Sequence, residues 1–155
     1  MVGVGIDLCA VDRMRRAIER HGDRFTRRIF TEQEAAYCSG RGRPWESLAG
    51  RFAVKEATSK ALGAPLGIGW HDVEVLPARS GEHGPSVVLR GKAREVAEAR
   101  GVTSVLISIT HAAGMAAAVA VLSTGGTVDP AMDGGARASD TGQREGDERG
   151  GRVGG

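Results

Sequence analysis

The sequence contains no asparagine, and only 3 of its 21 basic residues are lysine. Aromatic residues make up 4% of the chain, so its core has to be built mainly from valine, leucine, isoleucine and alanine. Few rings are present to stack on nucleic-acid bases. The net charge of +2 is also too small to indicate a nucleic-acid partner by itself.

The two cysteines, Cys9 and Cys38, are too few for a disulfide framework or a zinc site. We expect both to be reduced thiols in a cytoplasmic protein. No apolar run reaches the ~20 residues that a membrane-spanning helix needs, and the N-terminus lacks the basic-then-apolar pattern of a secretory signal. The sequence therefore predicts a soluble, cytoplasmic protein without a membrane partner.

The composition changes sharply after Leu122. Residues 123–155 hold ten of the 24 glycines, six acidic and four basic residues, and almost no large apolar side chains. Such a segment cannot bury enough apolar surface to offset the entropy lost when it orders. We therefore predict one folded domain over residues 1–122 and a disordered glycine-rich tail over residues 123–155.

Alternation of apolar residues with glycine and Asp7 predicts a strand over residues 1–8. Its valine, isoleucine and leucine side chains are expected to share the one buried face. A helix over about residues 10–20 follows and is expected to end at Gly22, a residue suited to a helix C-terminus.

Two further helices are indicated by their end signals. Thr31 and Glu34 have the spacing of a capping box, which would open a short helix to about Cys38. Pro44 suits the first turn of a helix, which is predicted to continue to residue 62 and to stop at Gly63.

The rest of the folded part reads as four strands and a helix. Strands are predicted over residues 70–77, 86–90, 104–111 and 115–122, and a helix over residues 92–99. The last two strands form a closing hairpin. The order β-α-α-α-β-β-α-β-β is typical of an α+β domain, with a largely antiparallel sheet packed by helices.

The helix of residues 44–62 carries the first candidate site residues. At 100° per residue, Glu56 and Lys60 project into its apolar, alanine-rich face. Lys55, Thr58 and Arg51 point away from that face and are expected to be solvated. The simplest explanation is an ordinary i,i+4 ion pair between Glu56 and Lys60.

Asp7 is the second candidate, on a strand face that otherwise carries only glycine. Its simplest role is to cap the following helix. Together with Glu56, however, it suits Mg²⁺, which keeps several waters and shares its ligation with substrate phosphates. Lys60, one turn from Glu56, would supply a point charge for the same phosphates. This combination favours phosphoryl transfer to or from a diphosphate.

Basic residues and one histidine complete the candidates. If the helix stays regular, an arc of about 80° collects four arginines: Arg13, Arg16, Arg20 and Arg24. They form either a solvated basic face or a docking surface for an acidic helix or a phosphate backbone. His111, at the end of a predicted strand, is either a core histidine or a phosphate contact.

These motifs together resemble holo-[acyl-carrier-protein] synthase, the small single-domain class of the phosphopantetheinyl transferases. The similarity covers about residues 2–122. The joined phenylalanine-x-x-lysine-glutamate-alanine block and the early glycine-x-aspartate are highly specific to that family. The segments in the family's order and spacing are "GIDL" at 5–8, Arg13, "GRFAVKEATSKALG" at 50–63, "HDVEV" at 71–75 and "SITH" at 108–111.

The resemblance implies an activity and roles for three residues. The 4'-phosphopantetheine group of coenzyme A would pass to a serine of an apo acyl carrier protein, and 3',5'-ADP would leave. Asp7 and Glu56 would bind Mg²⁺ with the diphosphate, and Lys60 would stabilise charge on it. Glu56, acting through a water, or an acid near it would take the serine proton.

The resemblance also implies partners. The family is typically a homotrimer with active sites between subunits. Its carriers, whether of fatty-acid, polyketide or peptide-synthetase type, present an acidic helix that the four arginines would receive. The candidates for holding the nucleotide are Arg51, Lys60, Gly63 with the loop that follows it, and His111.

Two functions of other classes compete with this interpretation. A non-catalytic module that binds an acidic helix would use the arginines and leave Glu56 and Lys60 as a structural pair. It would not need Asp7 on a glycine-only strand face. A small basic nucleic-acid binder would show a steep salt dependence on RNA or DNA.

Overall fold

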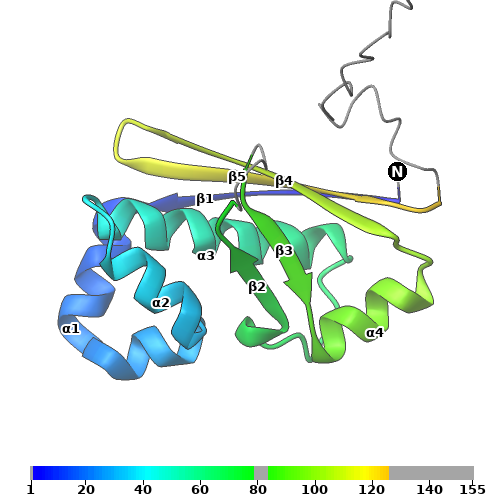
Figure 1. Cartoon of the computed structure of the whole chain (residues 1–155), viewed down its shortest axis with the longest axis horizontal. Helices are drawn as coiled ribbons and strands as arrows, with labels where there is room; N and C mark the ends of the chain where they lie inside the picture. The colour runs from blue at the N-terminus through cyan, green and yellow to red at the C-terminus, as the bar shows by residue number, and fades with distance from the viewer. Residues whose placement is uncertain (1, 79–83, 126–155) are drawn as a thin grey trace, which may run out of the picture.

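A computed structural model of the chain describes residues 2–78 and 84–125 (Figure 1). The predicted element order is confirmed, with one added 3-10 turn, η1. The elements are β1 (Gly3–Ala10), α1 (Val11–Ile29), α2 (Glu32–Ser39), α3 (Pro44–Ala61), η1 (Trp70–Asp72), β2 (Val73–Leu76), β3 (Ser86–Leu89), α4 (Gly91–Ala99), β4 (Ser104–Ala112) and β5 (Met115–Ser123). The predicted tail lies outside the described residues from position 126 onward.

The strands form two antiparallel sheets rather than one. One sheet has the order β1-β5-β4, and β2 pairs with β3 in the other. The β4–β5 hairpin turns through Ala113 and Gly114, both at positive φ, as tight hairpin turns require. In Figure 1 the three-stranded sheet is seen nearly edge-on, with α3 along one face and no helix drawn on the other. The core therefore lies between this sheet and α3.

The buried face of β1 is the opposite of the predicted one. Val4, Ile6 and Leu8 are 59%, 65% and 62% exposed, whereas the glycine side of the strand packs on α3. A Cβ atom on Gly5 would collide with the carbonyl oxygen of Ala57. The reason is steric, because only glycine lets the strand backbone approach the helix backbone this closely.

The prediction of a solvated face on α3 is also wrong. Arg51, Lys55 and Thr58 are buried, whereas Lys60 is exposed. The helix packs against the sheet on one side and against α1, α2 and β2 on the other. A helix enclosed in this way buries most of its circumference, so its polar residues do not mark a solvent-facing side.

The first helix continues beyond its predicted end. Gly22 breaks it with φ 57° and ψ −146°, but helical geometry resumes and reaches Ile29. The other end signals are confirmed. Thr31 and Glu34 form both bonds of the capping box, Pro44 stands in the first turn of α3, and Gly63 follows its end at φ 84°.

Candidate active site

Asp7 and Lys60 meet between β1 and α3. The Lys60 ammonium donates to Asp7 Oδ1 at 2.7 Å and to the Ile6 carbonyl at 3.2 Å. Lys60 is therefore paired with Asp7 and not, as the simplest explanation held, with Glu56. Asp7 is also not a helix cap, because Ala10 occupies the N-cap of α1 and no side chain caps it. The hydrogen bond that Lys60 donates to Asp7's carboxylate raises the pKa of Lys60.

Glu56 lies one turn before Lys60 and is half-buried. Burial raises the pKa of its carboxyl group, and the negative charge of Asp7 raises it further, against the opposing charge of Lys60. The two carboxylates are thus close enough to repel each other, and a divalent cation would relieve this repulsion.

The donor set fits Mg²⁺ shared with phosphate. Over residues 2–78 and 84–125, no cluster of three or more histidine, cysteine or acidic side chains is placed to hold a metal. The site offers the two carboxylates of Asp7 and Glu56. Mg²⁺ in proteins is usually bound by one or two carboxylates together with substrate phosphates and waters, so this donor set fits it.

A narrow pocket of about 80 Å³ opens beside Glu56. The Phe52 and Trp70 rings stack at its edge with centroids 5.1 Å apart. The loop between Gly63 and Gly69 leads into this pocket, with positive φ at Gly63, Ala64 and Gly67. The lining residues are Lys55, Glu56, Ser59, Ile68, Gly69, Trp70 and Val73. Of these residues, the sequence analysis proposed only Glu56 and the loop as parts of the site, and it did not identify Lys55, Ser59, Trp70 or Val73.

His111 and Arg51 lie apart from this cluster. His111 is exposed, which excludes the core-histidine alternative, and its Nε2 lies 3.0 Å from the Glu46 carbonyl oxygen. The Arg51 guanidinium is stacked over the Tyr37 ring at 4.3 Å, and its Nε atom is buried without a hydrogen-bond partner. Their predicted role in holding the nucleotide stays a prediction.

The four arginines of the predicted docking surface are all exposed. Arg16 pairs with Asp12 at 3.3 Å. The kink at Gly22 separates Arg24 from the other three, so the regular arc ends at Arg20. Arg13 stands in the first turn of α1, which directly follows the strand that carries Asp7.

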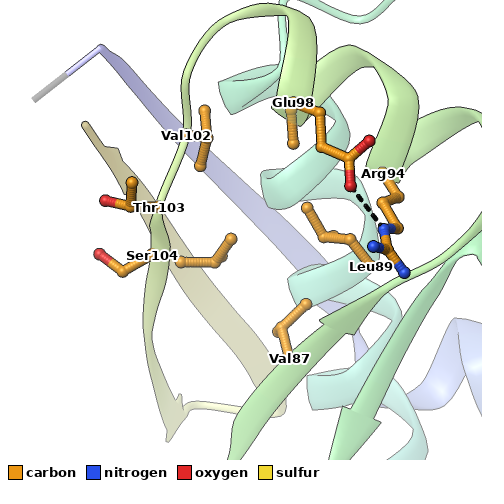
Figure 2. A pocket seen from close by; sticks show the side chains of 9 residues that line it. Val87, Leu89, Arg94, Glu98, Val102, Thr103 and Ser104 are labelled. Carbon is orange, nitrogen blue, oxygen red and sulfur yellow. Dashed lines mark hydrogen bonds and ion pairs between the residues drawn. The ribbon is translucent and has the colours of Figure 1, made fainter. Parts of the chain in front are cut away.

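A second pocket, of about 370 Å³, lies between β3, α4 and β4 (Figure 2). Val87, Leu89 and Val102 give it apolar walls, and an ion pair between Arg94 and Glu98 at 2.7 Å lies at its side on α4. None of the predicted site residues lines this pocket, so it is separate from the carboxylate site.

The family model of the 4'-phosphopantetheinyl transferase superfamily matches residues 3–117. The chain belongs to this superfamily. Within it, the chain is 44% identical over 124 residues to the holo-[acyl-carrier-protein] synthase of Solibacter usitatus, covering 79% of this chain and 98% of that protein. It is 44% identical over 123 residues to that of Moorella thermoacetica, covering 79% and 94%.

Solved holo-[acyl-carrier-protein] synthases have the same fold. The Helicobacter pylori enzyme, in complex with coenzyme A, matches with a TM-score of 0.66 at 30% identity and covers 77% of this chain and 99% of its own. The Bacillus anthracis enzyme, in complex with CoA (3',5'-ADP), matches with a TM-score of 0.63 at 33% identity and covers 80% and 97%.

The resemblance drawn from the motifs is therefore confirmed, and so is the α+β fold. The chain is a phosphopantetheinyl transferase of the holo-[acyl-carrier-protein] synthase type, an enzyme that moves phosphopantetheine from coenzyme A to an apo acyl carrier protein. The non-catalytic alternative is discarded. No helix in the described part of the chain is long and apolar enough to cross a membrane.

Proposed function

We propose that Asp7, Glu56 and Lys60 form the diphosphate site of an Mg²⁺-dependent transfer from coenzyme A to the carrier serine, with 3',5'-ADP as the leaving product. One observation carries this proposal. Asp7 and Lys60, 53 residues apart in the sequence, meet at 2.7 Å, beside the Glu56 carboxyl group, whose pKa is raised by burial and by the charge of Asp7. A partly exposed site that holds two carboxylates and an ammonium group suits a negatively charged substrate together with its metal cation.

Each of the three side chains has a definite task in this scheme. Asp7 and Glu56 would hold Mg²⁺, which supplies positive charge to the diphosphate as negative charge builds up on it. Lys60 stays protonated at neutral pH, because its pKa is raised, and offers a second positive charge. Glu56, acting through a water, or an acid near it would take the proton of the carrier serine.

Substitution of the two carboxylates tests the assignment. Asp7→Asn and Glu56→Gln are expected to reduce transfer by about 100-fold or more, since each removes charge stabilisation from the transition state. Transfer is followed by the mass increase of the carrier across an Mg²⁺ series, with melting curves to verify the fold. Glu46→Gln is the matched control, because it changes a carboxylate of α3 whose one ion pair within residues 2–78 and 84–125 is with Arg43. Near-normal turnover of either site variant at ordinary Mg²⁺ would rule out the site.

The exposed face of the β1-β5-β4 sheet supports a homotrimer. Val4, Val121 and Leu106 stand in one row across the three strands, and Val4, Ile6, Leu8 and Leu106 are all more than half exposed. A contiguous apolar face of this kind is typical of an interface between subunits. In such a trimer, His111 and Arg51 of one copy would complete the nucleotide site of its neighbour.

The arginine surface would receive the carrier. Because α1 directly follows the strand that carries Asp7, a carrier helix lying along Arg13, Arg16 and Arg20 would bring its serine toward the diphosphate. The opposite charges should raise the rate of encounter more than the final affinity. Cys9 and Cys38 are free and buried, as befits the reducing cytoplasm in which we place the reaction.

A further inference from the structure

A buried ion pair lies directly behind the proposed diphosphate site. The Lys55 ammonium is 2.8 Å from Glu34 Oε2, and both side chains are 1% exposed. The same ammonium donates to the carbonyl oxygens of Trp70 and Val73. A lysine ammonium has three protons, and each has an acceptor here. We call this group, the Lys55 ammonium with the Glu34 carboxylate and the two carbonyls, the Lys55 clamp.

Glu34 is equally fixed. Its Oε2 accepts from the Thr31 amide at 2.9 Å in the capping box, and its Oε1 accepts from the Val75 amide at 2.9 Å. The clamp therefore joins the start of α2, the middle of α3, η1 and β2. Two side chains thus hold four elements, and both oxygens of Glu34 and all three protons of Lys55 take part.

The clamp also forms part of the pocket beside Glu56. Lys55 and Trp70 both line that pocket, and Lys55 is the residue before Glu56. Lys55 bonds to the Trp70 carbonyl and so holds the residue that directly follows the Gly63–Gly69 loop. The wall facing Glu56 is thus anchored by a charge rather than by packing alone.

A purely structural role does not account for the charge. Burial lowers the pKa of Lys55, because taking the ammonium out of water has a cost. Apolar side chains of similar volume usually stabilise a core at least as well as a buried ion pair does. Three hydrogen bonds in fixed directions, however, define position in a way that apolar packing does not.

We propose that Lys55 and Glu34 are positioning residues: they hold the Trp70 wall against Glu56 so that the pocket is shaped for coenzyme A before it binds. This inference rests on the proposed diphosphate site. Both side chains are 1% exposed, so they would act through the Trp70 wall and not through direct contacts of their charged groups with coenzyme A. Loss of the clamp should therefore weaken the binding of coenzyme A and leave the recognition of the carrier unchanged.

The test uses the full chain with Trp45→Phe, which leaves Trp70 as the sole tryptophan of the two present and as a fluorescent reporter in the pocket wall. The double variant Lys55→Met with Glu34→Gln replaces the ion pair by a neutral pair, and glutamine still completes the capping box. Coenzyme A with Mg²⁺ is titrated against Trp70 fluorescence, and KM is measured for coenzyme A and for the carrier.

The double variant is expected to raise the Kd and KM for coenzyme A on the order of tenfold or more, since small displacements of a binding group have effects of this size. Its KM for the carrier should stay within about twofold of the parent's. Lys55→Arg, which keeps the charge in a longer planar group, should also raise the KM for coenzyme A, and it keeps the test open if the double variant does not fold.

Arg90→Gln is the control, because the Arg90 side chain bonds to Glu74 at 2.6 Å in the adjoining network but does not line the pocket. It should leave the Kd for coenzyme A unchanged. Unaltered coenzyme A binding in a folded Lys55 variant, or an equal loss in Arg90→Gln, would overturn the proposal. Full activity of Glu56→Gln would instead refute the diphosphate site itself, so the two failures are distinguishable.

Discussion

Gly5 decides whether β1 approaches α3 closely enough to bring Asp7 to Lys60. A Cβ atom at this position would overlap the Ala57 carbonyl oxygen and lie 2.7 Å from the Ala61 amide nitrogen. Both atoms belong to the backbone of a buried helix, so the overlap cannot be relieved by the rotation of a side chain. Gly5→Ala must therefore push the strand away from the helix.

The size of the effect follows from this contact. Overpacking of a core usually costs about 1–3 kcal/mol, and an overlap with rigid backbone belongs at the upper end, about 3 kcal/mol. For a domain of this size that corresponds to a fall in Tm of roughly 12 °C. Asp7 moves with the strand, and a displacement near 1 Å reduces rates by roughly 100-fold.

The assay compares Gly5→Ala with Gly42→Ala, where an added Cβ atom meets nothing within 4 Å. Melting curves and kcat/KM for transfer are measured well below the Tm of both variants. Gly42→Ala should be neutral or slightly stabilising, by roughly 0.4–1 kcal/mol. If Gly5→Ala matches Gly42→Ala in both Tm and kcat/KM, the close approach of β1 to α3 does not position Asp7.

Three further outcomes are expected. Arg20→Gln should raise the KM for the carrier but not the KM for coenzyme A, and the effect should be smaller at high salt. Arg15 is already paired with Asp12, so Arg15→Gln should change neither KM appreciably. Equal effects of the two variants would contradict a docking surface. Ending the chain after Gly125 should leave Tm and turnover unchanged, since the remaining residues have few apolar side chains to bury, and a fall in either would show that they dock. Ile6→Asp, on the exposed sheet face, should give monomers in light scattering and much lower activity in the transfer assay. An intact oligomer would place the interface elsewhere.

The sequence by itself determined the local structure and the chemistry. Caps, glycines and prolines act through bonds within a few residues, which is why the capping box at Thr31, the start of α3 at Pro44 and its end at Gly63 were all predictable. The family could be recognised for the same reason, because each motif that carries the resemblance, chiefly the block of residues 50–63 and the early glycine-x-aspartate at 5–7, is a local pattern.

Only the tertiary structure decided which faces meet. Alternation shows that Val4 and Gly5 lie on opposite sides of β1, but not which side packs on α3. The helical period likewise placed Lys55 away from Glu56 without revealing that Glu34 is its buried partner. Lys60 pairs with Asp7 and not with Glu56 because the glycines of β1 let the strand lie within reach of the Lys60 ammonium. Contacts between residues far apart in the sequence depend on how closely two backbones approach, and no local pattern contains that distance.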